Sequence, residues 1–185
     1  LCCDPGLLLE GYQGESAKTR LCLELIRNAV EGGHKVLLFS QFTSMLERLK
    51  AALKEEGVSF YSLDGSTPKA RRVQLVDAFN RDETQVFCVS LKAGGTGLNL
   101  TGADIVIHFD PWWNVAVQNQ ATDRAHRIGQ KNVVTVYRLI ARDTIEEKIV
   151  QLQERKSRLA EQILGSEDMG PASLTREALM EILEG

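Results

Sequence analysis

The sequence has 185 residues, of which 43% are hydrophobic and 25% charged, and its formal net charge at pH 7 is −3. This size and composition are typical of one soluble α/β domain, and the absence of any apolar run of roughly 20 residues excludes a membrane-spanning protein. The slightly negative charge excludes a uniformly basic surface of the kind that coats nucleic acids, although a local basic cleft is compatible with it.

The first residues, Leu1-Cys2-Cys3-Asp4, provide neither an initiator Met nor the basic and apolar regions of a signal peptide, so we expect a piece of a longer chain. The four cysteines, at positions 2, 3, 22 and 88, show no C-x-x-C spacing and include an adjacent pair, which disfavours a metal clamp. Free thiols of this kind predict an intracellular, reducing location and no structural metal.

Short apolar, β-branched runs alternate with segments of helical periodicity along the chain. We predict strands at 35–39, 60–63, 86–90, 105–109 and 133–139. We predict helices at about 16–31, 43–56, 68–80 and 115–128. Strands that alternate with helices are typical of a parallel sheet covered on both faces. The expected fold is therefore α/β, with an open, mainly parallel, doubly wound sheet.

Two helix ends carry local signals. Gly32-Gly33 should end the first helix, because glycine adopts the left-handed conformation that closes a helix. Thr67 should cap the third helix ahead of Pro68, whose missing N–H costs nothing at the first helical position. The residues expected to point inward from this helix are Val73, Val76 and Phe79.

The segment after the last strand predicts an amphipathic helix over 144–164, packed on the rest of the protein. Its apolar stripe consists of Ile145, Ile149, Leu152, Leu159 and Ile163. Two glycines and a proline then predict a linker before a short final helix. The expected organisation is a main domain over 1–142, a brace helix over 143–164, and a linker with a terminal helix over 165–185.

A glycine-rich turn, 91–100, follows the strand predicted at 86–90. Such a turn at the carboxyl end of a parallel strand lets backbone N–H groups approach a phosphate. The alternative is a tight turn that only needs glycine for its backbone angles. The turn is not a Walker A loop, because Lys92 precedes the glycines and no G-K-[ST] occurs in the sequence.

The segment Gln120–Gln130 combines amide, cationic and apolar residues with helical spacing. On a helix, Gln120, Arg124 and Arg127 would share one stripe, so that two guanidinium groups point the same way. Planar cationic donors of this kind stabilise the transition state of phosphoryl transfer. The alternative is a solvated helix face with an Asp123–Arg127 salt bridge.

Several segments, in the same order, resemble the motifs of SWI/SNF-type helicase-like ATPases, a branch of helicase superfamily 2. Gln120–Gln130 (QATDRAHRIGQ) resembles motif VI, 94–104 (GGTGLNLTGAD) resembles motif V, and 36–42 (VLLFSQF) resembles motif IV. Residues 63–67 with Arg72 resemble the segment after motif IV, and 109–114 (FDPWWN) resembles the tryptophan segment, although Val115 stands where the family often has proline. The likeness runs over about 1–164 and implies a second, C-terminal RecA-like lobe.

The resemblance implies a role for each matching residue. Arg124 and Arg127 would be arginine fingers, supported at the nucleotide by Gln120, Gly95 and Gly97. The residues expected to contact DNA are Gln41, Gly65, Arg72, Lys92, Gly94 and Trp113, which suit backbone contacts and aromatic stacking without base reading.

The resemblance also implies the setting of the reaction. The parent protein would be a DNA-dependent ATPase that uses ATP and Mg²⁺, bound mainly by a first lobe that carries the P-loop, and this chain alone should be inactive. Its partners would be double-stranded DNA, the first lobe and DNA-bound proteins, in the nucleus or in the bacterial cytoplasm and nucleoid. An RNA or DNA helicase lobe, or a catalytically silent nucleic-acid-binding module, is the alternative.

Some residues allow a structural interpretation. Trp112 and Trp113 could each be core residues, because both can bury a large apolar area. His108, inside an apolar strand, is expected in the core, and His126 is expected to be a satisfied histidine. Asp82-Glu83 ends a predicted helix and is expected to be a surface turn rather than a Walker B motif.

Overall fold

Five strands form one parallel sheet, in a computed structural model that describes residues 2–7, 14, 16–91, 93, 98–125 and 132–165. The strands are β1 (Val36–Ser40), β2 (Phe60–Leu63), β3 (Val86–Ser90), β4 (Ile105–His108) and β5 (Thr135–Arg138). Their order across the sheet is β2-β3-β1-β4-β5, and every neighbouring pair is parallel. The predicted parallel sheet is confirmed, with each strand within two residues of its expected bounds.

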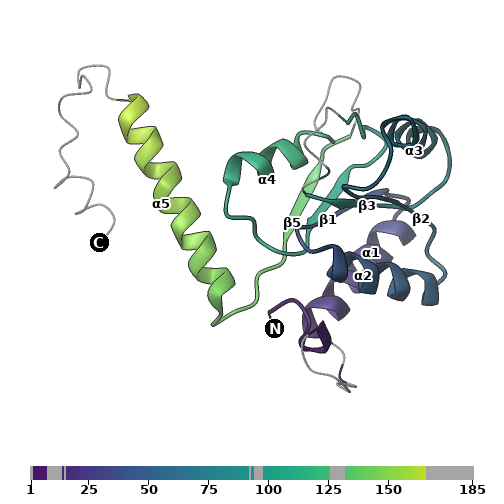
Figure 1. Cartoon of the computed structure of the whole chain (residues 1–185), viewed down its shortest axis with the longest axis horizontal. Helices are drawn as coiled ribbons and strands as arrows, with labels where there is room; N and C mark the ends of the chain where they lie inside the picture. The colour runs from purple at the N-terminus through teal and green to yellow at the C-terminus, as the bar shows by residue number, and fades with distance from the viewer. Residues whose placement is uncertain are drawn as a thin grey trace.

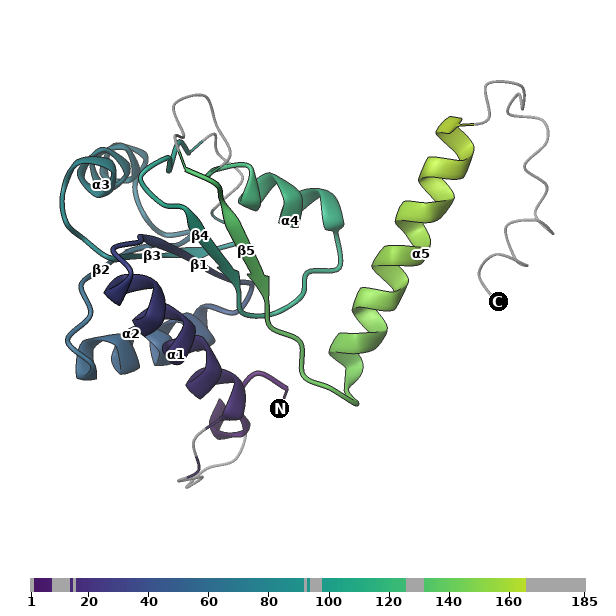
Figure 2. The ribbon, with the colours of Figure 1, turned by 180° about the vertical axis from the view of Figure 1, so that it is seen from behind.

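Helices cover both faces of the sheet. Helices α1 (Ala17–Glu31) and α2 (Thr43–Glu55) lie on one face, and α3 (Lys69–Arg81) and α4 (Val115–Thr122) lie on the other (Figure 1, Figure 2). A short 3-10 helix, η1 (Pro5–Leu7), precedes α1, and α5 (Ile145–Gly165) follows β5. The doubly wound arrangement is therefore confirmed. None of the helices in the described part of the chain is long and apolar enough to span a bilayer.

The central strands are buried on both faces. All residues of β1 and β3 are buried, and alternate side chains of β1 enter opposite layers: Leu38 packs among the α1 and α2 residues, and Leu37 and Phe39 among those of α3 and α4. Burial of one such side chain contributes about 1.5–3 kcal/mol. Continuous apolar runs, rather than alternating ones, are what a sheet covered on both faces requires.

Helix α1 has the ends that its sequence predicts. The Ser16 hydroxyl caps its first turn by accepting a hydrogen bond from the Thr19 N–H at 3.4 Å. Gly32 is the C-cap and Gly33 adopts φ +76°, a left-handed conformation that a residue with a Cβ atom avoids. The expected glycine stop is confirmed.

Helix α3 begins later and faces the sheet differently than predicted. Pro68, not Thr67, is the N-cap, because the Thr67 hydroxyl hydrogen-bonds instead to Asp64. Val76 and Phe79 point inward as expected, but Val73 is 56% exposed, which corrects the prediction. The stripe that faces the sheet holds positions 72, 75, 76 and 79, so that Arg72 occupies the place of an apolar residue.

Helix α5 departs most from its predicted packing. Its ribbon stands apart from the sheet beyond its first turns (Figure 1, Figure 2). Ile149 is buried, but Ile145 is 54% exposed and Leu152 is also exposed, so these two members of the expected apolar stripe are not packed on the domain. The side chains of Leu159 and Ile163 lie outside the described residues, as does the expected terminal helix.

The carboxyl ends of β1 and β4 form a topological switch point. The chain leaves β1 for α2 on one face of the sheet and leaves β4 for α4 on the other face. Open α/β sheets bind their ligands beside such a switch point, because the connections diverge there. In this protein Ser40 ends β1 at this edge, Gln41 comes directly after it, and Asp110 follows β4.

Candidate nucleotide and DNA interface

Because all strands are parallel, the segments that follow them meet at one edge of the sheet. Gln41 follows β1, Gly65 follows β2, and Trp113 follows β4. The structure thus brings three of the expected DNA-contacting residues to the same edge. Lys92, Gly94, Gly95 and Gly97 of the glycine-rich turn lie outside the described residues. The turn's flanks, Leu91, Ala93 and Leu98, are buried and anchor it in the core.

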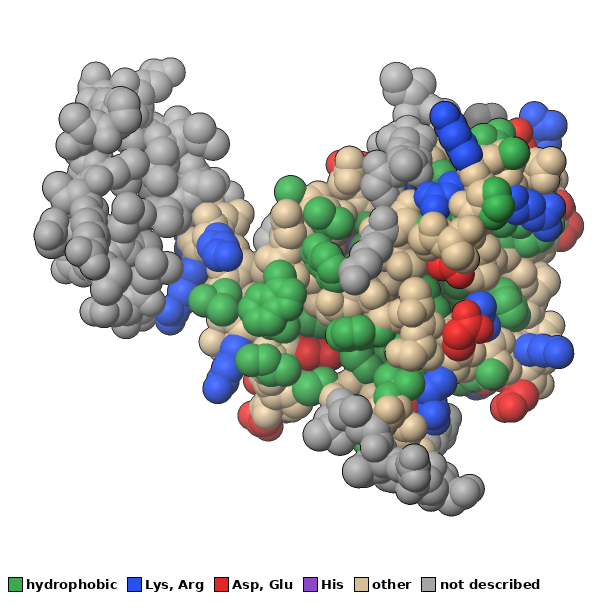
Figure 3. Space-filling view, viewed as in Figure 1, with side chains coloured by type: hydrophobic (Ala, Val, Ile, Leu, Met, Phe, Trp, Pro, Cys, Tyr) green, Lys and Arg blue, Asp and Glu red, His purple; other side chains and the backbone are tan. Residues whose placement is uncertain are grey.

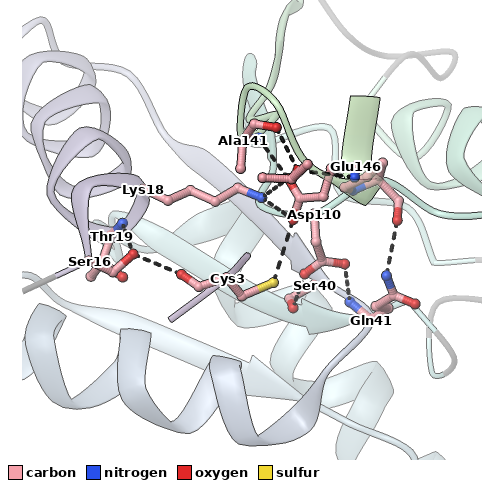
Figure 4. Close-up of polar contacts among 11 residues, drawn as sticks. Cys3, Ser16, Lys18, Thr19, Ser40, Gln41, Asp110, Ala141 and Glu146 are labelled. Carbon is pink, nitrogen blue, oxygen red and sulfur yellow. Dashed lines mark hydrogen bonds and ion pairs between the residues drawn. The ribbon is translucent and has the colours of Figure 1, made fainter. Parts of the chain in front are cut away.

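Gln41 is fixed by the loop after β4. Its backbone N–H donates to Asp110 Oδ1 at 3.0 Å, and its side-chain Nε2 donates to the Pro111 carbonyl at 3.0 Å (Figure 4). The side chain is only half-buried. Its amide oxygen can therefore accept a hydrogen bond from a ligand while the nitrogen holds the loop in place.

The turn after β2 is organised around one carboxylate, and we call residues 64–67 the Asp64 turn. Asp64 Oδ1 accepts hydrogen bonds from the backbone N–H and hydroxyl groups of Ser66 and Thr67, at 2.6–3.2 Å. These bonds, the Ser66 hydroxyl's first, hold the pKa of Asp64 below its usual range. A Cβ added at Gly65 would meet no atom within 4 Å, so this position faces open space.

Arg72 ties the Asp64 turn to the glycine-rich turn. Its Nε donates to the Thr67 carbonyl at 2.8 Å, and its Nη2 donates to the Asp64 carbonyl at 3.1 Å. Nη1 donates to the Ala93 carbonyl at 3.1 Å. A planar guanidinium suits such a bridge because its donors point in fixed directions. Arg72 therefore positions backbone in both turns in addition to presenting a cation at this edge.

The two tryptophans have different environments. Trp112 is half-buried and packs against the core layer formed with α3 and α4, whereas Trp113 is 57% exposed. The Trp112 backbone is held on both sides: its N–H donates to Gln118 Oε1 at 3.3 Å, and its carbonyl accepts from Gln153 Nε2 of α5. The structural interpretation therefore fits Trp112, and Trp113 is free to contact a ligand.

The end of α4 differs from its prediction. The expected helix over 115–128 ends at Thr122, and the Asp123–Ala125 segment forms a turn in which Arg124 N–H and Ala125 N–H bond three residues back. The Arg124 carbonyl accepts from the Leu100 N–H at 3.1 Å, a tertiary contact with the end of the glycine-rich turn, and residues 126–128 of the expected helix lie outside the described residues. Asn114 caps the start of the helix, so Val115 does begin it.

Arg124 is consequently not on a shared exposed stripe. It is 1% exposed, and its Nη1 donates to the Leu98 carbonyl at 3.5 Å, whereas Gln120 is exposed to solvent. The prediction that these two side chains project together is wrong for this conformation. Arg127, His126 and the expected Asp123–Arg127 salt bridge lie outside the described residues.

His108 and Asp82-Glu83 are structural, as expected. His108 is buried, stacks on Phe39 and contacts the Thr122 hydroxyl through Nε2 at 2.9 Å. Burial lowers the pKa of His108 to about 4, so the imidazole is neutral at pH 7. Asp82 is the C-cap of α3 and Glu83 is exposed beside it.

A buried group of charged and polar side chains adjoins Gln41, and periodicity gave no sign of it. We call Cys3, Lys18, Ser40, Asp110 and Glu146 the buried ion-pair cluster (Figure 4). Lys18 Nζ lies 2.6 Å from Glu146 Oε2, and the Ser40 hydroxyl donates to Asp110 Oδ2. One sequence feature could have indicated it: Lys18 lies in the first turn of a helix, where a cation interacts unfavourably with the helix dipole. A lysine at such a position suggests a compensating carboxylate elsewhere in the fold.

Burial sets the charge states in this cluster. It raises the pKa of Asp110, against the lowering effect of the hydrogen bonds from Ser40 and Gln41. Burial, with Asp110 nearby, also raises the pKa of Cys3 to about 12, so Cys3 is a neutral thiol and not a nucleophile. Its Sγ lies 3.8 Å from Glu146 Oε1 as a weak donor.

An apolar groove opens beside the cluster. Figure 3 shows hydrophobic side chains gathered between the sheet domain and α5. The groove has a volume of about 450 Å³ and includes the exposed residues Phe42, Trp113 and Ile145. An exposed apolar group of this kind is typical of a surface that meets another protein segment or a ligand.

Comparisons with known proteins agree on one family. The model described as "Helicase conserved C-terminal domain" matches residues 17–129. The chain is 45% identical over 176 residues to an uncharacterized ATP-dependent helicase of Mycoplasma pneumoniae, which covers 95% of this chain and 17% of that protein. It is 42% identical to Protein CHROMATIN REMODELING 19 of Arabidopsis thaliana, over 97% of this chain and 24% of that protein.

A solved structure supports the same relationship. The crystal structure of the C-terminal part of the Fun30 ATPase domain superposes with a TM-score of 0.73 at 41% identity, covering 78% of this chain and 48% of that one. The likeness confirms the RecA-like architecture. The chain spans about a fifth of the length of the two relatives named above.

Proposed function

The chain belongs to the helicase conserved C-terminal domain family, with relatives among SWI/SNF-type remodelling ATPases, and on that premise we propose that it is the second RecA-like lobe of an ATP-dependent double-stranded DNA translocase. The sequence contains no G-K-[ST], so the P-loop would belong to a first lobe elsewhere in the parent protein. The lobe's own part is to complete the nucleotide site and to hold DNA.

The observation that supports this proposal best is the shared carboxyl edge. Gln41, the Asp64 turn and Trp113 lie along it, and Arg72 links the Asp64 turn to the glycine-rich turn. Backbone donors, an amide, a cation and an exposed aromatic ring suit contacts to phosphates and sugars without base reading. We propose that Gln41, Gly65, Arg72, Lys92, Gly94 and Trp113 contact the DNA backbone.

At the nucleotide, we propose that Arg124 and Arg127 act as arginine fingers with Gln120, Gly95 and Gly97 beside them. Guanidinium groups delivered from a second lobe stabilise the charge that develops on the γ-phosphate oxygens. Since Arg124 is 1% exposed, the turn at 123–125 must move before its guanidinium reaches ATP. Lobe closure is the step at which that movement would occur.

The rest of the setting follows from the same proposal. Mg²⁺ would be held with ATP by the first lobe, where the P-loop would lie. The parent would act inside the cell, in a nucleus or a bacterial cytoplasm and nucleoid, on DNA and its bound proteins.

Replacement of the fingers tests the proposal. In the full-length parent, Arg127→Lys keeps the charge but loses the planar pair of donors, so DNA-stimulated ATP turnover should fall about 10³- to 10⁵-fold, and Arg124→Lys should behave alike. Melting temperature and DNA affinity should stay nearly unchanged for Arg127→Lys. Arg71→Lys, an equivalent change on exposed α3, is the matched control.

Two outcomes would contradict the assignment. If both lysine variants kept turnover within about threefold of the parent, well under the tenfold that corresponds to 1.4 kcal/mol, neither arginine would be a finger. If the 185-residue chain failed to restore DNA-dependent turnover to a separately supplied first lobe, the silent-module alternative would replace the enzyme. Preference for RNA over DNA as the activator would favour an RNA helicase lobe.

A further inference from the structure

Helix α5 buries Ile149 as its sequence predicts, but it also buries two polar residues and exposes two of its predicted apolar ones. The polar residues Glu146 and Gln153 are buried at 4% and 8% exposure, and the apolar Ile145 and Leu152 face outward. Glu146 and Gln153 are seven residues apart, which is two turns of helix, so they share one face. The domain therefore holds α5 through two buried polar groups in addition to the buried Ile149.

The first attachment is the ion pair at the base of α5. Lys18 Nζ donates to both carboxylate oxygens of Glu146, at 2.7 and 2.6 Å, and the two side chains are 7% and 5% exposed. Glu146 Oε2 also accepts from the Ala141 N–H at 2.8 Å. The Lys18 ammonium lies 5.2 Å from the centre of the Phe109 ring (Figure 4 shows the polar contacts). The Glu146 carboxylate thus joins α1, the segment that follows β5, and α5.

The second attachment reaches the tryptophan segment. Gln153 Nε2 donates to the Trp112 carbonyl, and Gln118 of α4 accepts from the Trp112 N–H. The next residue, Trp113, is the exposed aromatic of the carboxyl edge. The direction of α5 and the position of Trp113 are therefore connected through a single peptide segment.

We propose that Lys18 is a positioning residue: its buried pair with Glu146, together with the Gln153 contact to Trp112, fixes the direction in which α5 leaves the domain and with it the Trp112–Trp113 segment. Apolar contacts are non-directional and allow a helix to slide or rotate. A bidentate pair admits one geometry, and a buried charge cannot exchange its partner for water. The expected effect on DNA-stimulated turnover rests on the proposed function; the orientation of α5 does not.

Distance measurements between spin labels test the orientation directly. Labels are attached through Glu154→Cys on α5 and Arg71→Cys on α3, in a Cys2→Ser background of the 185-residue chain, since Cys3, Cys22 and Cys88 are buried thiols with raised pKa values. Position 154 lies about 12 Å along the helix from Glu146, so a tilt of about 25° moves the label by about 5 Å.

The proposal predicts that Lys18→Met shifts or broadens the distance distribution by more than about 5 Å, whereas Lys148→Met, an exposed lysine on the same helix, leaves it unchanged. Should Lys18→Met fail to fold, Lys18→Met/Glu146→Gln removes both buried charges and must still misdirect α5, because the bidentate pair is gone. Distances within about 1.5 Å of the parent's in the single variant, or in the double variant if the single does not fold, would overturn the proposal.

Turnover provides the second measurement. In the full-length parent, Lys18→Met should lower DNA-stimulated turnover by at least about tenfold with little change in KM for ATP, since small misplacements of positioned groups are costly. Unchanged label distances would overturn the positioning role of Lys18 even if the parent is an active ATPase. A parent without any ATPase activity would overturn the proposed function and leave the distance prediction to stand or fall by itself.

Discussion

The Asp64 turn and the buried ion-pair cluster lie at the same edge of the sheet, yet they hold their polar groups by different means. In the Asp64 turn, one carboxylate accepts four hydrogen bonds near solvent and Arg72 bridges backbone carbonyls. In the cluster, Lys18 and Glu146 pair at 2.6 Å with side chains only 7% and 5% exposed, near Ser40 and Asp110.

The two regions differ in how easily their polar contacts can rearrange when a ligand binds. A hydrogen bond near solvent contributes about 1 kcal/mol net, because water replaces a lost partner. A buried charge has no such replacement, so the loss of its partner leaves an uncompensated ion. The Asp64 turn can therefore adjust to a ligand, and the cluster is suited to hold one fixed arrangement.

The largest effect should come from breaking the buried pair. Lys18→Met leaves the Glu146 carboxylate buried and unpaired, so the free energy of unfolding should fall by about 3–5 kcal/mol, measured by urea denaturation. Lys18→Met/Glu146→Gln should recover a large part of that loss, because both charges are gone. Arg27→Ala, which breaks the exposed Arg27–Glu56 pair, is the control and should cost under about 1 kcal/mol. Equal losses of unfolding free energy for the two variants would show that the buried pair is no more fixed than the exposed one.

A smaller, pH-dependent effect should come from His108, which is buried without a charged partner. Its folded-state pKa of about 4 lies below the usual 6.5, so between these values the unfolded chain binds the extra proton. The free energy of unfolding is therefore highest above pH 6.5 and falls by at most about 3 kcal/mol as the pH is lowered to 4.

His108→Gln isolates that contribution. The variant lacks the titrating imidazole, so its stability should depend less on pH between 6.5 and 4 than the parent's, as measured by denaturation at a series of pH values. Asp110, whose pKa is raised by burial, contributes with the opposite sign above its usual pKa of 3.8 but is present in both proteins. Parallel pH profiles would show that His108 is not protonated on unfolding in this range.

The smallest effect should come from the Asp64 turn. Asp64→Asn keeps the shape of the side chain but weakens the four charge-assisted hydrogen bonds that Oδ1 accepts, and nearby water compensates most of the loss. Unfolding free energy should drop by about 1 kcal/mol, less than half the effect of Lys18→Met. A loss as large as that of the buried pair would mean that the turn, like the cluster, is a fixed structure.

The sequence predicted the elements whose signal is local. Apolar, β-branched runs predicted all five strands within two residues; β1, β3 and β4 are buried throughout, whereas the edge strands β2 and β5 are largely half-buried or exposed. Gly32-Gly33 marked a helix end because the left-handed backbone conformation is itself a local property. The motif resemblance named Gln41, Gly65 and Trp113 as DNA contacts, and the parallel topology brings them to one edge of the sheet.

Predictions failed where a distant partner outweighed local periodicity. The helical spacing predicted that Val73 points inward from α3, but its side chain is exposed. Arg72, the neighbouring residue, instead bonds to backbone carbonyls of two turns. The helix expected to run to 128 ends at Thr122, and the Arg124 carbonyl in the turn that follows accepts from the Leu100 N–H. Ala93, which accepts from Arg72, and Leu100, which donates to Arg124, both lie more than 20 residues from their partners in the sequence. A short sequence window therefore does not contain these contacts.

The parallel α/β architecture and the motif order could be predicted from the sequence, because apolar patterns and helix caps are formed by neighbouring residues. The face of α5 that meets the domain could not: apolar spacing favours Ile145 inward, and the structure buries Glu146 instead. The reason is Lys18, which is 128 residues away in the sequence and pairs with Glu146. A buried ammonium without a carboxylate partner would destabilise the fold more than the exposure of one isoleucine does.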